Sequence, residues 1–176
     1  MTLIDALNTN GRFQLGETSE RLVLATRAEN RAASVALVRQ ARHSLLIIIR
    51  ELDGPLYANA PFVDVVSTLA RRSRHTSTRI LVMESEAIMH QGHLLIELSQ
   101  RLSSSIQIRK LGEEGRDFNQ ACLVADSTGV LHRPQSDLYA GTLDFNAPGQ
   151  AQILTARFEE LWEHSAPDPE LRRLHV

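Results

Sequence analysis

Apolar residues follow two alternating patterns along the chain. Short continuous apolar runs predict strands, and the β-branched run at 45–49 is typical of a strand buried on both faces. The predicted strands are 22–25, 45–49, 79–83, 106–110, 121–125, 130–132 and 138–143. Between the early strands and after the last one, apolar residues recur every three or four positions, which is helical spacing. The predicted helices are 26–42, 61–75, 86–102 and 149–163.

The order of these elements indicates an α/β fold. Strands and helices alternate as far as residue 110, which favours parallel strands with helices on their faces. The later strands are joined by short turns, which favours antiparallel pairing at one side. We therefore expect a mixed, largely parallel sheet flanked by helices. We expect an irregular N-terminal arm at 1–20, the α/β domain at 21–165 and a C-terminal tail at 166–176.

The composition narrows the function classes. With 43% hydrophobic and 23% charged residues, the 176-residue chain suits one domain of ordinary size. Its net charge of −2 gives no overall attraction to nucleic acid or acidic lipid. Cys122 is the only cysteine, which excludes an intrachain disulfide and a cysteine-based zinc site, and we expect no cofactor. The sequence has neither an apolar run of the roughly 18–20 residues that span a bilayer nor a signal-peptide pattern at its start, so we expect a cytoplasmic protein without membrane insertion.

A motif surrounds the predicted strand at 121–125. Residues 119–126 read Asn-Gln-Ala-Cys-Leu-Val-Ala-Asp, and residues 133–136 read Arg-Pro-Gln-Ser. With the order of the elements and a last helix that contains Phe-x-x-Leu-Trp, this stretch resembles one repeat of the phospholipase D superfamily. The family's motif reads His-x-Lys-x-x-x-x-Asp, followed by a segment with Gly, Ser or Gly, and Asn. Asp126 stands at the aspartate position, but Asn119 stands at the histidine position and Ala121 at the lysine position.

The resemblance implies the fold of a single phospholipase D-like half. Two such halves normally meet to form one site, so the resemblance also implies a homodimer. The family's reaction needs an imidazole nucleophile, but the amide of Asn119 cannot attack phosphorus and then leave. The reaction also needs a lysine, and loss of one preorganised charge-stabilising group costs about 3–4 kcal/mol. We therefore regard Asn119, Ala121 and Asp126 as vestigial motif positions and expect no catalysis of the family's type.

Three hypotheses about function follow. The first is a non-catalytic binding module whose partner is RNA or another protein. The second is an enzyme, such as a phosphodiesterase or nuclease, that uses other residues of the same cleft, where Asn119, Arg116 and Arg133 are candidate phosphate ligands. The chain is also similar to small uncharacterised bacterial proteins of this fold, some of them associated with acetyltransferase domains. That resemblance gives the third hypothesis, an accessory domain of an acetyltransferase.

Basic residues gather where two predicted helices end, and Lys110 is the only lysine among the 19 basic residues. In a parallel α/β layout these ends lie at one edge of the sheet and can form a positive face that follows a phosphate backbone. The candidate residues of this face are Arg39, Arg42, Arg71, Arg72 and Arg74. Cations also suit the last turn of any helix, a GC-rich genome favours arginine, and an aromatic content of 5% argues against base stacking.

A pair of histidines was weighed as a metal site. His90 and His93 are three positions apart on a predicted helix, so their rings can share a metal. The remaining ligands of a three- or four-ligand set are not apparent in the sequence. A hydrogen bond at the start of a helix explains a histidine there equally well, and we expect no metal site.

Overall fold

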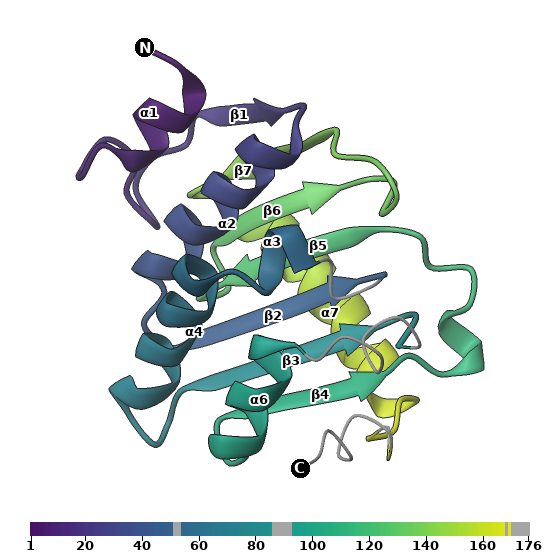
Figure 1. The fold of residues 1–176 in the computed structure, drawn as a ribbon. Coiled ribbons are helices and arrows are strands. Elements are labelled where there is room, and N and C mark those ends of the chain that lie inside the picture. The colour runs from purple at the N-terminus through teal and green to yellow at the C-terminus, as the bar shows by residue number, and fades with distance from the viewer. Residues whose placement is uncertain (51–53, 86–92, 168, 170–176) are drawn as a thin grey trace.

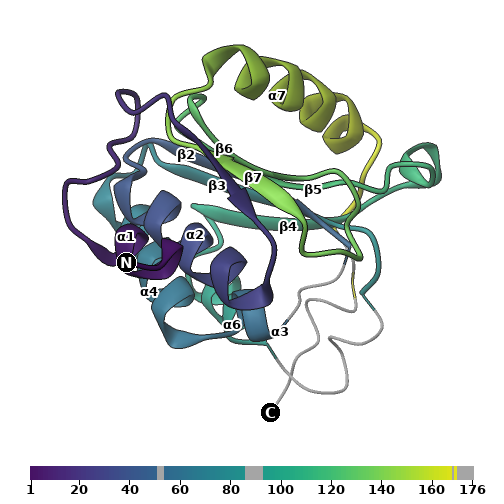
Figure 2. The ribbon, with the colours of Figure 1, turned by 90° about the horizontal axis from the view of Figure 1, so that it is seen from above.

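The structure is a computed structural model that describes residues 1–50, 54–85, 93–167 and 169. The strands are β1 (Arg21–Leu24), β2 (Ser44–Ile49), β3 (Ser77–Val82), β4 (Ile106–Lys110), β5 (Ala121–Ala125), β6 (Gly129–Arg133) and β7 (Gly141–Asp144). The helical segments are α1 (Leu3–Asn8), α2 (Arg27–Gln40), α3 (Gly54–Tyr57), α4 (Ala60–Arg72), α6 (Leu94–Arg101), the 3-10 turn η1 (Glu113–Gly115) and α7 (Pro148–Glu163). The sheet lies in the middle, with α1, α2, α3, α4 and α6 on one face and α7 on the other (Figures 1 and 2).

The sheet has seven strands in the order β1-β7-β6-β5-β2-β3-β4. The predicted mixed α/β sheet flanked by helices is confirmed, but its parallel part is smaller than expected. Only β2–β3 and β3–β4 pair in parallel, and the other four pairings are antiparallel. The cause is the connection from β4 to β5, which holds only η1. Parallel pairing needs a longer crossover, usually a helix, so β5 runs antiparallel to β2.

Strand β2 separates two apolar cores. Leu45, Ile47 and Ile49 face the side of α2 and α4, whereas Leu46 and Ile48 face α7. Both sets are buried, which confirms the prediction of a strand covered on both faces. No helix among the described residues is long and apolar enough to cross a membrane.

Two arginines of the sheet hold α7 in place. The guanidinium of Arg79 forms an ion pair with Glu159 and lies 5.2 Å from the ring centroid of Phe158. The guanidinium of Arg109 lies 4.3 Å from the ring centroid of Trp162 and donates a hydrogen bond to that residue's carbonyl oxygen at 3.1 Å. Trp162 and Phe158 are buried, so their predicted place in the core is confirmed. Two of the arginines are therefore structural.

The N-terminal segment is more ordered than the sequence suggested. The expected irregular arm contains α1, which begins with a capping box between Thr2 and Asp5. Phe13 is buried and stacks on Phe145 at 5.6 Å between ring centroids. Gln40 accepts a hydrogen bond from the Leu15 amide and donates one to the Phe13 carbonyl oxygen, both at 2.9 Å. The segment is thus part of the domain, because its few apolar residues pack against α2 and β7.

Candidate functional site

The motif positions lie at opposite ends of β5. Asn119 precedes the strand, and Asp126 follows it in the turn to β6. A strand advances about 3.3 Å per residue, so the five residues of β5 separate the two side chains. The sequence analysis had placed Asp126 beside the cleft residues, but the structure puts the two in different surroundings.

Asn119 is tied to the segment that follows the motif. Its side-chain oxygen accepts a hydrogen bond from the Ser136 hydroxyl at 2.7 Å, and its carbonyl oxygen accepts one from the Ser136 amide at 2.9 Å. Ser136 is buried and Asn119 is exposed. The two degenerate segments of the motif therefore still meet, but the side chains that meet are an amide and a hydroxyl. This pair contains no imidazole.

A cation lies directly opposite the lost lysine. Ala121 on β5 and Arg133 on β6 are register partners, so their side chains share one face of the sheet. Arg133 is 4% exposed and donates a hydrogen bond to the Leu138 carbonyl oxygen at 3.2 Å. Its guanidinium also lies 5.8 Å from the Tyr139 ring centroid. Among the described residues no carboxylate pairs with it, so the buried positive charge is held by a carbonyl group and a ring.

Asp126 has an architectural role. Its carboxylate accepts hydrogen bonds from the backbone amides of Arg42, His43 and Ser44 at 2.8, 2.8 and 3.0 Å. Asp126 and Ser127 both have positive φ, 52° and 57°, as the central residues of a type I′ turn require. The aspartate thus fastens the β5–β6 hairpin to the junction between α2 and β2.

A small hollow lies at the Asn119 end of the sheet. It measures about 410 Å³, and Asn119, Arg116 and Lys110 line it. Arg116 is 3.5 Å from a carboxylate oxygen of Glu113, so its charge is partly balanced. Of the three predicted phosphate ligands, the structure brings Arg116 and Asn119 to this hollow. Arg133 is not among its described lining residues.

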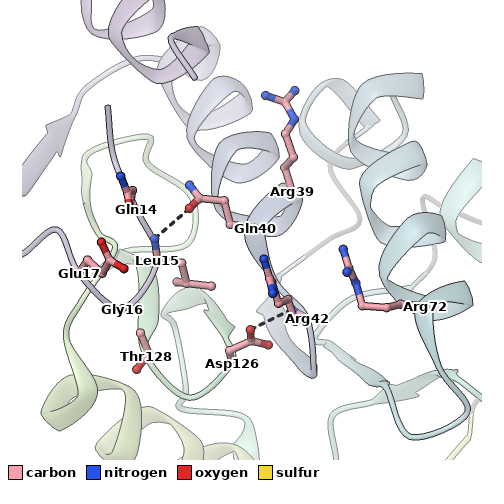
Figure 3. Close-up of a pocket in the computed structure, with 10 residues that line it drawn as sticks. All are labelled: Gln14, Leu15, Gly16, Glu17, Arg39, Gln40, Arg42, Arg72, Asp126 and Thr128. Atoms are coloured by element: carbon pink, nitrogen blue, oxygen red, sulfur yellow. Dashed lines mark hydrogen bonds between the residues drawn. The ribbon is translucent and has the colours of Figure 1, made fainter. Parts of the chain in front are cut away.

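A larger hollow of about 620 Å³ lies at the Asp126 end, and we call it the arginine hollow. Arg39, Arg42 and Arg72 line it, together with Gln40, Asp126 and residues 14–17 (Figure 3). Arg39 comes from the last turn of α2, Arg42 from the loop after α2, and Arg72 from the end of α4. Three of the five residues predicted for a basic face are therefore brought together. The other two do not line this hollow: Arg71 donates to the Ser67 hydroxyl and Arg74 to the ring of His75.

The charge of the arginine hollow is predominantly positive. Arg39, Arg42 and Arg72 are exposed, and none of their guanidinium groups makes an ion pair or hydrogen bond with another described residue. Two carboxylates line the hollow, Glu17 and Asp126. The oxygens of Asp126 are directed at three backbone amides, which offset part of its charge. Three unpaired guanidinium groups around one concave surface are suited to oxyanions such as phosphates.

The histidine pair is only partly described. His90 lies outside the described residues. His93 is buried and caps α6, where its Nδ1 accepts a hydrogen bond from the Leu95 amide at 3.1 Å. The described part of the chain contains no group of three histidine, cysteine or acidic side chains that could hold a metal ion.

Two titratable groups lie on the α7 face of β5 and β6. Burial raises the pKa of the Cys122 thiol to about 12, which keeps it protonated and unreactive. Burial, and next the charge of Arg21, lower the pKa of His132. Its Nε2 is 2.8 Å from the side-chain oxygen of Gln120. The sequence analysis predicted the inert thiol but did not single out His132, because a lone histidine in a strand carries no motif.

Comparison with solved structures defines the class. The chain is similar to NucT from Helicobacter pylori (TM-score 0.60, 15% identity, 85% of this chain and 99% of that one) and to Nuc from Salmonella typhimurium, a phospholipase D family member (TM-score 0.59, 13% identity, 85% and 99%). It is also similar to TrmBL2, an archaeal chromatin protein with a novel mode of DNA binding (TM-score 0.61, 15% identity, 84% and 54%), and spans about half of that chain. These likenesses and the motif spacing define a phospholipase D-like fold, as the resemblance implied.

The family can be stated more narrowly. A family model described as "Domain of unknown function (DUF7931)" matches residues 26–174, so the chain belongs to that family. No curated protein matches the sequence. The family description assigns no activity, and function must therefore be argued from the site.

Proposed function

We propose that this chain is a non-catalytic phospholipase D-like domain that binds nucleic acid through the arginine hollow. The observation that carries the proposal is the convergence of Arg39, Arg42 and Arg72 from three segments, none of them paired with a described carboxylate. Leaving three like charges together without counter-ions is unfavourable unless an anion completes the site.

The absence of catalysis is supported by the motif. Asn119 offers an amide that is hydrogen-bonded to Ser136, and Ala121 offers a methyl group. Neither group can act as nucleophile or neutralise a phosphoryl oxygen. A second copy of the chain would bring the same two side chains, so the proposed homodimer would not restore the reaction.

The choice of nucleic acid over another anion rests on the spread of the charges. The arginines line a hollow that is open to solvent, and a polymer with regularly spaced phosphates can contact all of them at once. The archaeal chromatin protein that shares the fold binds DNA. An acidic protein partner is the competing explanation, and it predicts no binding to nucleic acid at any salt concentration.

The test is a binding titration with labelled single-stranded RNA and duplex DNA at low and moderate salt, with the mass in solution measured on the same sample. Wild-type protein is compared with a variant that carries Arg39→Ala, Arg42→Ala and Arg72→Ala. The matched control carries Arg12→Ala, Arg101→Ala and Arg116→Ala, which remove the same charge from other exposed sites.

We expect salt-sensitive binding that the control retains and the hollow variant loses. The slope of log K against log salt should fall in magnitude by about 2 to 3 when three phosphate contacts are removed. Equal loss in both triple variants would mean that net charge alone drives binding and would contradict the proposal. The mass measurement tests the proposed homodimer separately.

A further inference from the structure

A second concave surface adjoins the arginine hollow. It measures about 790 Å³ and lies along α2, between that helix and residues of α1, α3 and α4, and we call it the α2 groove. Its lining is mainly apolar, and Ala28, Ala32 and Val35 contribute from α2. Arg39 lines both surfaces, so the groove and the arginine hollow are continuous.

The arginines of the α2 groove continue the positive face. Arg27 and Arg31 line it in addition to Arg39, so cations follow one helix from its first turn to its last. At 1.5 Å per residue, Arg27 and Arg39 are about 18 Å apart along the helix axis. Arg31 and Arg39 make no ion pair with a described residue, whereas Arg27 donates a hydrogen bond from Nε to the Tyr139 hydroxyl at 3.1 Å.

We infer that the nucleic acid bound by this domain is single-stranded and that it runs from the arginine hollow along the α2 groove. This inference rests on the proposed function. The physical reason is the apolar lining beside the arginines. In a duplex the base faces are stacked inside, so the lining would face phosphates and gain nothing. An unpaired strand can place base faces against Ala28, Ala32 and Val35 while its phosphates reach the arginines.

The contact surface differs from that of most single-strand binders. It is aliphatic, and Tyr139 is the one aromatic residue among its described lining. The faces of that ring already lie near Arg27 and Arg133, at 5.7 and 5.8 Å from the ring centroid. Guanidinium planes also stack on bases, so Arg27, which Tyr139 holds in place, can serve that role.

The test compares a labelled 12-nucleotide single strand with the duplex of the same sequence. Arg31→Ala removes a cation from the α2 groove, and Arg101→Ala is its control on α6. Ala28→Glu places a carboxylate on the apolar lining, and Ala156→Glu makes the same change at an exposed alanine of α7, on the other face of the sheet. Circular dichroism of each variant checks that the fold is intact.

We expect wild-type protein to bind the single strand more tightly than the duplex. Arg31→Ala should lower the magnitude of the single-strand salt slope by about 0.7, and Ala28→Glu should weaken single-strand binding by about tenfold or more. Neither change should affect the duplex, and both control variants should behave as wild type. If Arg31→Ala and Ala28→Glu leave single-strand binding unchanged while the arginine-hollow variant abolishes it, the inference is wrong and the proposed function stands. If wild-type protein binds neither probe, both are wrong.

Discussion

Restoring the lysine of the family motif should destabilise this protein. The substitution Ala121→Lys places an ammonium on β5 directly opposite the guanidinium of Arg133 on β6. Opposed residues in neighbouring strands have Cβ atoms about 4.5–5.5 Å apart. Ala121 is 1% exposed and Arg133 is 4% exposed, so solvent screens the two charges poorly.

The size of the effect follows from the geometry. Two like charges about 5 Å apart repel by about 3 kcal/mol at an effective dielectric constant of 20. Removing an ammonium from water adds a further penalty of several kcal/mol. We therefore expect the free energy of unfolding to fall by about 3 kcal/mol or more, against a total of about 5–15 kcal/mol for a typical domain.

Urea denaturation of five proteins measures this repulsion: wild type, Ala121→Lys, Ala121→Met, Arg133→Met and the double variant Ala121→Lys with Arg133→Met. Ala121→Met has a similar volume without charge, so it reports the cost of overpacking alone. The double-mutant cycle isolates the interaction between the two charges. Equal stability of Ala121→Lys and Ala121→Met, or a coupling energy near zero, would refute the reasoning.

Four further predictions concern single residues. Asp126→Ala removes three charge-assisted hydrogen bonds and should lower the free energy of unfolding by about 3 kcal/mol, measured by urea denaturation. Ser127→Gly should raise it by about 0.5–1 kcal/mol, because glycine adopts a φ of 57° without steric cost. Cys122 should resist iodoacetamide at pH 8 in native protein and react after unfolding, since its pKa is raised to about 12, and fast labelling of native protein would contradict its burial. The lowered pKa of His132 means that the unfolded chain binds a proton more readily than the native one. The free energy of unfolding should therefore decrease as the pH falls below about 6.5, and His132→Gln should reduce that decrease in pH-dependent melting.

The sequence predicted most elements because their signals are local. The apolar runs placed β4 and β5 at their observed residues, and Thr26 with Glu29 formed the predicted capping box. The last predicted strand began too early: 138–140 belong to a loop, and β7 starts at Gly141. Leu138 is 48% exposed, and its carbonyl oxygen instead accepts the hydrogen bond of Arg133. A hydrogen bond between a strand and a later loop leaves no periodic signal in the sequence.

The candidate site was predicted in part, for a similar reason. That two helix ends carry arginines was visible in the sequence, and the parallel pairing of β2 with β3 brings those ends to one edge. Which arginines share a hollow depends on side-chain direction, so Arg71 and Arg74 could not be separated from Arg72. The α2 groove escaped prediction because Arg27 and Arg31 lie at the start of their helix, where the search for cations at helix ends did not extend.

The three amides that point at Asp126 provide a natural spectroscopic reporter. The amide protons of Arg42, His43 and Ser44 share one carboxylate, so any change at that group shifts their three NMR signals together. Arg42 itself lines the arginine hollow. An anion that binds there can therefore be detected without a label, and the same three signals would show whether an arginine variant has kept its local fold.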